Sequence, residues 1–193
     1  MLLGESPLTF AALTSALTEH FPYHATPADQ MAFLRRALER LGTSLGYRVT
    51  PPHLERPHSD PCLDLVWWEP GRGTVLAADC DWGNAGEVAA AFTQLMTLKA
   101  PMKLLIFRTR HAGSERQDIT LRTDIAAVLR AVGAAVVDFS QHLQGELYLL
   151  AELVPQQRIF RAYEFVVPVN GRLALSFEEA ARVFRQQEEM VTR

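Results

Sequence analysis

The order of helix and strand patterns between residues 27 and 108 constrains the fold of this chain more than any other feature. From Pro27, apolar residues recur every three or four positions, which predicts an amphipathic helix that ends near Gly42 or Gly46. Three strand patterns follow, "YRVTPP", "CLDLVWWEP" and "TVLAADCDW". The turn "PGRG" joins the last two and predicts a hairpin.

A second helix and a fourth strand complete this order. In "NAGEVAAAFTQLMTLKAP", Asn84 precedes the apolar stripe and Glu87 stands three residues later, the spacing of a capping box. The next apolar run, "MKLLIFRTR", predicts a strand buried on both faces. The predicted order is therefore helix, strand, strand, strand, helix, strand.

The flanking sequence predicts further elements of the same kinds. A short helix is expected over Thr9–His20 and another from about Gln117 to Ala131, followed by a small strand at "AAVVDF". The runs "GELYLLAELVP" and "RIFRAYEFVVP" predict two strands joined at "PQQR". In the final segment "SFEEAARVFRQQEEMV", Ser176 and Glu179 have capping-box spacing and predict a helix.

Length and composition favour one α/β domain that spans residues 1–193. The chain has 193 residues and is 48% hydrophobic, enough for a single core. Lys and Arg total 19 against 22 Asp and Glu, so contact with DNA or RNA requires a local basic patch. Two cysteines, Cys62 and Cys80, are too few for a disulfide framework. With no basic leader and no apolar run of roughly 18 residues, we expect a cytoplasmic protein with no membrane partner.

Three aspartates suggest a site within residues 27–108. Asp79 and Asp81 are two apart in a predicted strand, so their side chains share one face of the sheet. Asp64 lies in the other predicted strand of the hairpin, so its carboxylate is a candidate neighbour of Asp79 and Asp81. Carboxylates on adjacent strands can hold Mg²⁺, which activates water for phosphodiester hydrolysis. The alternative is structural: Asp64 faces solvent at an edge strand, and Asp79 and Asp81 cap the next helix or face solvent.

The order of elements and the acids "LDLVWW" and "AADCDW" resemble the restriction-endonuclease-like, or PD-(D/E)XK, nuclease superfamily over residues 28–108. That resemblance implies a mixed central sheet flanked by helices, with an αβββαβ core to which residues 109–193 add strands and a C-terminal helix. It also implies that Asp64 and Asp79 bind Mg²⁺ or Mn²⁺. Asp81 stands where the family has a lysine, and would serve as a third ligand or orient water. Gln94, expected to face inward from the following helix, would support the site.

Two functions follow from this resemblance. The first is a divalent-metal-dependent nuclease, with Asp64, Asp79, Asp81 and Gln94 as the catalytic set. The alternative is a catalytically inactive protein of this fold that serves as an interaction or nucleic-acid-binding subunit, which the missing lysine and the acidic net charge favour.

Other residues give weaker indications. Arg108, Arg110 and Arg116 follow the fourth predicted strand and could grip phosphates, although a solvated loop of mixed charge explains them as well. Trp67 and Trp68 are adjacent and point in opposite directions, so at least one belongs to the core and an exposed one could stack on a base. An exposed strand in the second half could mediate a homodimer.

Overall fold

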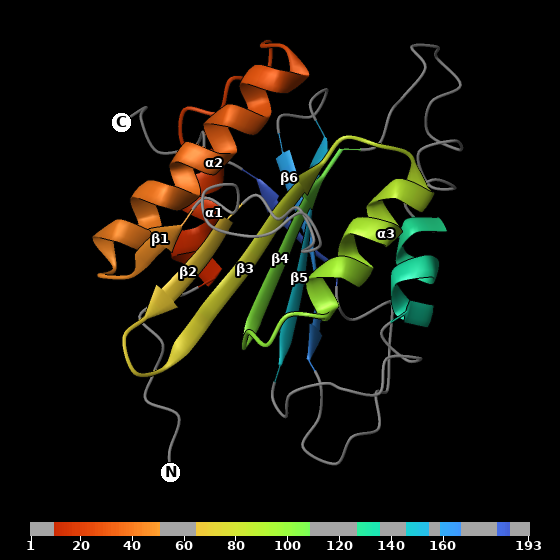
Figure 1. Ribbon diagram of the computed structural model, residues 1–193. Coiled ribbons are helices and arrows are strands. Elements are labelled where there is room, and N and C mark those ends of the chain that lie inside the picture. The colour runs from red at the N-terminus through yellow and green to blue at the C-terminus, as the bar shows by residue number, and fades with distance from the viewer. Residues whose placement is uncertain are drawn as a thin grey trace.

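The computed structural model describes residues 10–50, 65–108, 127–135, 146–154, 159–166 and 181–185. Its strands form a seven-stranded sheet whose spatial order equals the sequence order (Figure 1). The strands are β1 (Arg48–Thr50), β2 (Leu65–Glu69), β3 (Gly73–Asp81), β4 (Met102–Phe107), β5 (Leu147–Val154), β6 (Ile159–Val166) and β7 (Ala181–Arg185).

Strand directions make this sheet mixed. Strands β1, β2 and β3 are antiparallel to one another in turn, β3, β4 and β5 run parallel, and β6 and β7 return antiparallel. The structure thus confirms the predicted α/β class with a mixed central sheet. The predicted order of elements over residues 27–108 is also present, as α2, β1, β2, β3, α3 and β4.

Helices cover both faces of the sheet (Figure 1). Helices α1 (Phe10–Thr18) and α2 (Pro27–Ser44) pack on one side, here called the α2 face. Helix α3 (Ala85–Met96) and the helical segment 127–135 pack on the other side, the α3 face. Each face has its own apolar core, with Leu34 and Trp67 fully buried on the α2 face and Phe92 and Leu105 on the α3 face. None of the helices described is both long and apolar enough to cross a lipid bilayer.

Local sequence explains both ends of α2. Thr26 caps its start by accepting a hydrogen bond from the Asp29 amide, and Pro27 occupies the first turn, where no donor is lost. At the other end Gly46 adopts a left-handed φ of 85°, and the Tyr47 amide donates to the Gly42 carbonyl over 3.0 Å. Gly46 therefore ends the helix, whereas Gly42 lies inside it.

The hairpin between β2 and β3 forms as its turn residues predict. The Arg72 amide donates to the Glu69 carbonyl over 3.1 Å, and Gly71 has a φ of 82°. Pro70 precedes Gly71, and this is the residue order of a type II turn.

The predicted C-terminal helix over 176–191 is wrong in its centre, because residues 181–185 form β7. These residues pair antiparallel with β6, from Ala181 opposite Tyr163 to Arg185 opposite Ile159. This pairing gives hydrogen-bond partners to the backbone groups along the outer edge of β6. Such long-range hydrogen bonding overrides the local preference of residues 181–185 for a helix. Residues 176–180, with both predicted cap residues, and 186–191 lie outside the described part of the chain. The small strand expected at "AAVVDF" is also wrong at its start, since residues 134 and 135 are helical.

Candidate functional site

The candidate site lies at the carboxyl end of β3, on the α3 face. Ala78 and Cys80 belong to the core of the α2 face, so the alternating Asp79 and Asp81 project toward α3. This confirms that the two aspartates share one face. Because β3 is parallel to β4 and β5, their carboxyl ends meet at one edge of the sheet, where α/β proteins commonly bind ligands.

Asp79 is the more deeply placed of the two acids. It is 8% exposed and lies opposite Leu105 of β4, which is fully buried. Its Oδ1 accepts a hydrogen bond of 2.9 Å from the Cys80 amide. A carboxylate in such surroundings is costly unless polar partners or a cation compensate its charge.

Asp81 is half-buried and belongs to the hydrogen-bonded turn between β3 and α3. Its Oδ1 accepts a bond of 2.7 Å from the Gly83 amide, and its carbonyl accepts one of 3.2 Å from the Arg108 amide. A Cβ at Gly83 would overlap the Glu87 side chain and lie 2.9 Å from Asp81 Oδ1. Only glycine fits at this position, and the carboxylates of Asp81 and Glu87 both lie against it.

The start of α3 confirms the predicted capping box. Asn84 Oδ1 accepts from the Gly86 and Glu87 amides, and Glu87 Oε2 accepts from the Asn84 amide over 2.7 Å. The carboxylates of Asp81 and Glu87 therefore both accept hydrogen bonds from backbone amides next to the start of α3, where the helix dipole favours negative charge. Asp81 thus stabilises the turn that leads into α3, whereas the cap of the helix itself is Asn84, so the predicted capping alternative does not hold for Asp81.

Asp64, the remaining acid of the predicted set, lies outside the described residues. Strand β2 is described from Leu65, which pairs with Ala78, the residue before Asp79. Within the described ranges, no group of three or more His, Cys, Asp or Glu side chains could hold a metal ion. Asp79 and Asp81 provide oxygen donors, the kind that Mg²⁺ and Mn²⁺ prefer, but they form at most part of a ligand set.

Gln94 does not face inward, so that expectation is wrong. Its side chain is exposed, whereas Phe92 and Leu95 of the same helix are fully buried. Phe92 and Leu95 occupy the sheet-facing stripe, and the helical period turns Gln94 away from it. Gln94 also lies in the third turn of α3, roughly 13 Å along the helix axis from Ala85.

Arg108 is held on the α2 face, across the sheet from the two aspartates. Its guanidinium Nη1 donates a bond of 3.0 Å to Oε1 of Gln30, a residue of α2 that is 1% exposed. The Gln30 amide group in turn donates to the carbonyls of Pro22 and Tyr23. Burial lowers the pKa of Arg108. The guanidinium thus joins β4 to α2, while Arg110 and Arg116 lie outside the described residues.

Sequence reasoning missed a buried polar cluster on the α3 face. Lys103, on β4, is 1% exposed and forms an ion pair with Glu146, also 1% exposed. Tyr148, on β5, donates a bond of 2.7 Å from its hydroxyl to Glu146 Oε2. Lys103 lies opposite Ala77, two residues before Asp79, which corresponds to about 7 Å along the strand. The available signal was one lysine within the apolar run "MKLLIF".

A second missed cluster lies near the other end of β5. Glu152 is 1% exposed, and its Oε2 accepts a bond of 3.1 Å from the Tyr163 hydroxyl. Arg161 Nη1 lies 3.8 Å from the same oxygen. Glu152 and Asp81 both pair with Phe107, from opposite sides, which places them roughly 10 Å apart across the sheet. The buried Phe107 separates these two acids.

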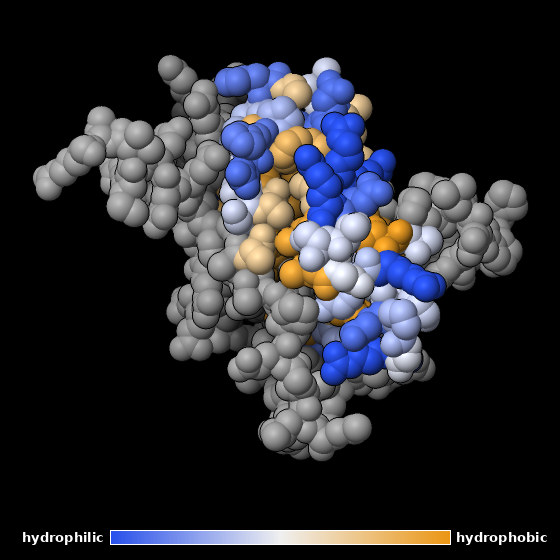
Figure 2. Space-filling view, turned by 90° about the vertical axis from the view of Figure 1, so that its left-hand side faces the viewer, coloured by the Kyte–Doolittle hydropathy of each residue, from blue (hydrophilic) through white to orange (hydrophobic). Residues whose placement is uncertain are grey.

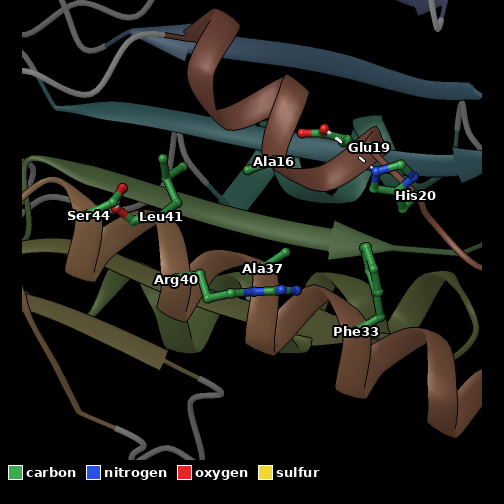
Figure 3. A pocket seen from close by; sticks show the side chains of 8 residues that line it. All are labelled: Ala16, Glu19, His20, Phe33, Ala37, Arg40, Leu41 and Ser44. Atoms are coloured by element: carbon green, nitrogen blue, oxygen red, sulfur yellow. Dashed lines mark hydrogen bonds and ion pairs between the residues drawn. The ribbon is translucent and has the colours of Figure 1, made fainter.

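The structure also has a hollow of about 510 Å³ between α1 and α2 (Figure 3). Figure 3 shows that α2 supplies Phe33, Ala37, Arg40, Leu41 and Ser44, while Ala16, Glu19 and His20 come from α1 and the residues after it. On the side of the molecule that carries α2, Figure 2 shows apolar residues flanked by strongly hydrophilic ones. Because α1 and α2 cover the α2 face, this hollow is not continuous with Asp79 and Asp81.

No protein-family model matches this chain, and no curated protein matches it in sequence.

Proposed function

We propose that this protein is a restriction-endonuclease-like, divalent-metal-dependent nuclease whose site lies at the carboxyl end of β3. The observation that supports the proposal is the placement of Asp79 and Asp81 on one face of β3, directly before α3, within the order α2, β1, β2, β3, α3, β4. This arrangement agrees with the superfamily's order of elements, in which the third strand carries an acid at the position of Asp79 and a helix follows it.

Asp64, Asp79 and Asp81 would hold Mg²⁺ or Mn²⁺ as oxygen ligands. A metal ion held there would lower the pKa of a bound water and offset the negative charge that develops on the phosphate. The chain's own contribution is orientation: the Cys80 amide fixes one oxygen of Asp79, and the Gly83 amide fixes one oxygen of Asp81. Gln94 has no part in this proposal, because it is exposed and far from the acids.

The test is cleavage of single- and double-stranded DNA and RNA with Mg²⁺ or Mn²⁺, compared with EDTA. We expect metal-dependent cleavage that Asp64→Ala and Asp79→Asn each reduce at least 100-fold, since each removes a metal-binding charge. The matched control is Glu39→Gln, which changes an exposed carboxylate on α2 and should retain full activity. Activity that survives both aspartate substitutions would belong to another site or to a contaminant.

A second candidate is a catalytically inactive protein of this fold that binds nucleic acid or a partner protein. It is favoured by Asp81, which occupies the position of the family's lysine and accepts a backbone hydrogen bond beside α3. Binding of nucleic acid without cleavage, under every metal condition, would select this candidate. Cleavage that depends on Asp79 would exclude it.

A further inference from the structure

Among the residues that the structure describes, Trp68 of β2 is the one large apolar side chain that is exposed, and it belongs to neither core. Trp68 is 36% exposed, whereas the adjacent Trp67 is fully buried. Trp67 stacks on Tyr47 with ring centroids 5.6 Å apart and belongs to the α2 face. The ladder between β2 and β3 shifts register between Trp67 and Trp68, whereas the pairing of β2 with β1 stays regular. Because Val66 packs against the core of the α3 face, alternation along β2 directs Trp68 to that face, the face of Asp79 and Asp81.

Arg48 stands beside this exposed ring. It pairs with Trp68 across β1 and β2, and its guanidinium carbon lies 5.5 Å from the ring centroid. Arg48 and Thr50 are both exposed and alternate with Val49, which packs on the α2 face. The indole and guanidinium thus form a cation–π pair that places a positive charge at the exposed ring.

The position of Arg48 and Trp68 relative to Asp79 and Asp81 suggests a path along the sheet for an extended ligand. Trp68 pairs with Thr74, and Asp79 lies five residues further along β3, roughly 17 Å away. Helix α3 packs mainly on β3 and β4, and Trp68 of β2 keeps 36% of its surface exposed. The part of β3 between Thr74 and Asp79 is covered on this face by α3, where Ala77 is fully buried, so a single nucleic-acid strand that reaches both ends would run over β2, where Val66 is half-buried. A few nucleotides of extended chain would span this length.

We propose that Arg48 and Trp68 form a stacking site for an unpaired base of a single-stranded nucleic acid, with Arg48 also contacting its phosphate. This inference rests on the proposed function and specifies its substrate class. An exposed indole stacks on any base, and a guanidinium supplies both a planar surface and donors to phosphate oxygens. A duplex keeps its bases stacked on one another and cannot use an aromatic platform in this way.

The test is binding of a fluorescently labelled single-stranded oligonucleotide, followed by anisotropy in EDTA so that no cleavage occurs. We expect Trp68→Ala to raise Kd about 5- to 100-fold, the effect of losing one stacked base, and Trp68→Phe to restore most of the affinity. Arg48→Ala should weaken binding and reduce the slope of log Kd against log salt by about 0.7, the value for one phosphate contact to a single strand. Arg40→Ala, an exposed arginine on α2, is the matched control and should leave both quantities unchanged.

Three outcomes would overturn the inference: no binding of single strands, equal affinity of the wild-type protein and Trp68→Ala, or a preference for the duplex. Trp68→Phe guards against misfolding, because it retains the packing of the ring. Binding through Trp68 without cleavage in Mg²⁺ or Mn²⁺ would contradict the nuclease but support the stacking site. Cleavage with an unchanged KM in Trp68→Ala would support the nuclease and reject the stacking site.

Discussion

The Lys103 ammonium forms an ion pair with the Glu146 carboxylate inside the core between the sheet and α3. Each side chain is 1% exposed. The Tyr148 hydroxyl donates to the same carboxylate over 2.7 Å, and its ring centroid lies 4.8 Å from Lys103 Nζ. The pair thus joins β4 to the start of β5, which places two opposite charges in a region otherwise filled by apolar side chains.

At a pH below the pKa of Lys103, where this lysine is protonated, we expect Lys103→Met to destabilise the protein by about 3 to 5 kcal/mol, because it leaves the Glu146 carboxylate buried without its cation. The double variant Lys103→Met/Glu146→Gln removes both charges and should recover a large part of that loss. Urea unfolding of the two single variants and the double variant measures the coupling. Additive losses in the double variant would contradict a direct ion pair.

The stability of the protein should depend on pH through Lys103. Burial lowers its pKa to about 7, and the charge of Lys99 acts in the same direction. The Glu146 carboxylate opposes this shift. Between pH 7 and about 10.5, the lysine of the unfolded chain stays protonated while the folded one loses its proton. The free energy of unfolding should therefore rise with pH in this window, by at most about 1.4 kcal/mol per pH unit.

The measurement is the difference between the unfolding free energies of the wild-type protein and Lys103→Met, taken from pH 7 to 10. This difference removes the titration of all groups that the two proteins share. A flat difference would mean that Glu146 holds Lys103 protonated over the whole range.

Gly42→Ala should destabilise the protein by about 1 to 3 kcal/mol through overpacking. A Cβ at Gly42 would lie 2.7 Å from the indole of Trp67 and 2.8 Å from Cγ2 of Val49, and the fully buried indole has no space into which to move. The exposed neighbour Thr43 is the matched control, since Thr43→Ala changes the same helix without a new contact. Thermal unfolding compares the two, and a stabilised Gly42→Ala would mean that α2 can shift away from β2.

Asp81→Asn and Asp81→Ala separate the two uses of this side chain. The asparagine oxygen can still accept the Gly83 amide bond, so we expect its stability to remain close to that of the wild-type protein. Asp81→Ala loses the bond and should cost about 1 kcal/mol. If Asp81 also binds a metal, both variants should abolish the rise in melting temperature on addition of Mn²⁺. Equal destabilisation by Asp81→Asn and Asp81→Ala would contradict a stabilising bond from the Gly83 amide.

The sequence predicted those parts of the fold that depend on neighbouring residues. The capping box of Asn84 and Glu87, the proline-glycine turn before β3 and the burial of β4 all appear as expected, because each depends on a short pattern. Residues 181–185 form a strand because β6 pairs with them, a relationship that no local pattern contains.

Contacts between residues that are far apart in the sequence also limited how much of the site could be predicted. The shared face of Asp79 and Asp81 follows from strand alternation alone. By contrast, the contact between Arg108 and Gln30 joins residues 78 positions apart. The partners of Lys103 were equally inaccessible, because Glu146 directly precedes β5 and Tyr148 belongs to it, more than 40 residues further along the chain.

The sheet's strand order has a consequence for how the chain can fold. Since β1 to β7 lie side by side in the order of synthesis, each new strand can join the outer edge of those already formed. No strand has to insert between two earlier ones, and the antiparallel pairs β2–β3 and β5–β6 are each joined by a short connection. The sheet can thus grow in one direction as the polypeptide leaves the ribosome, with the paired β1, β2 and β3 available as its first template.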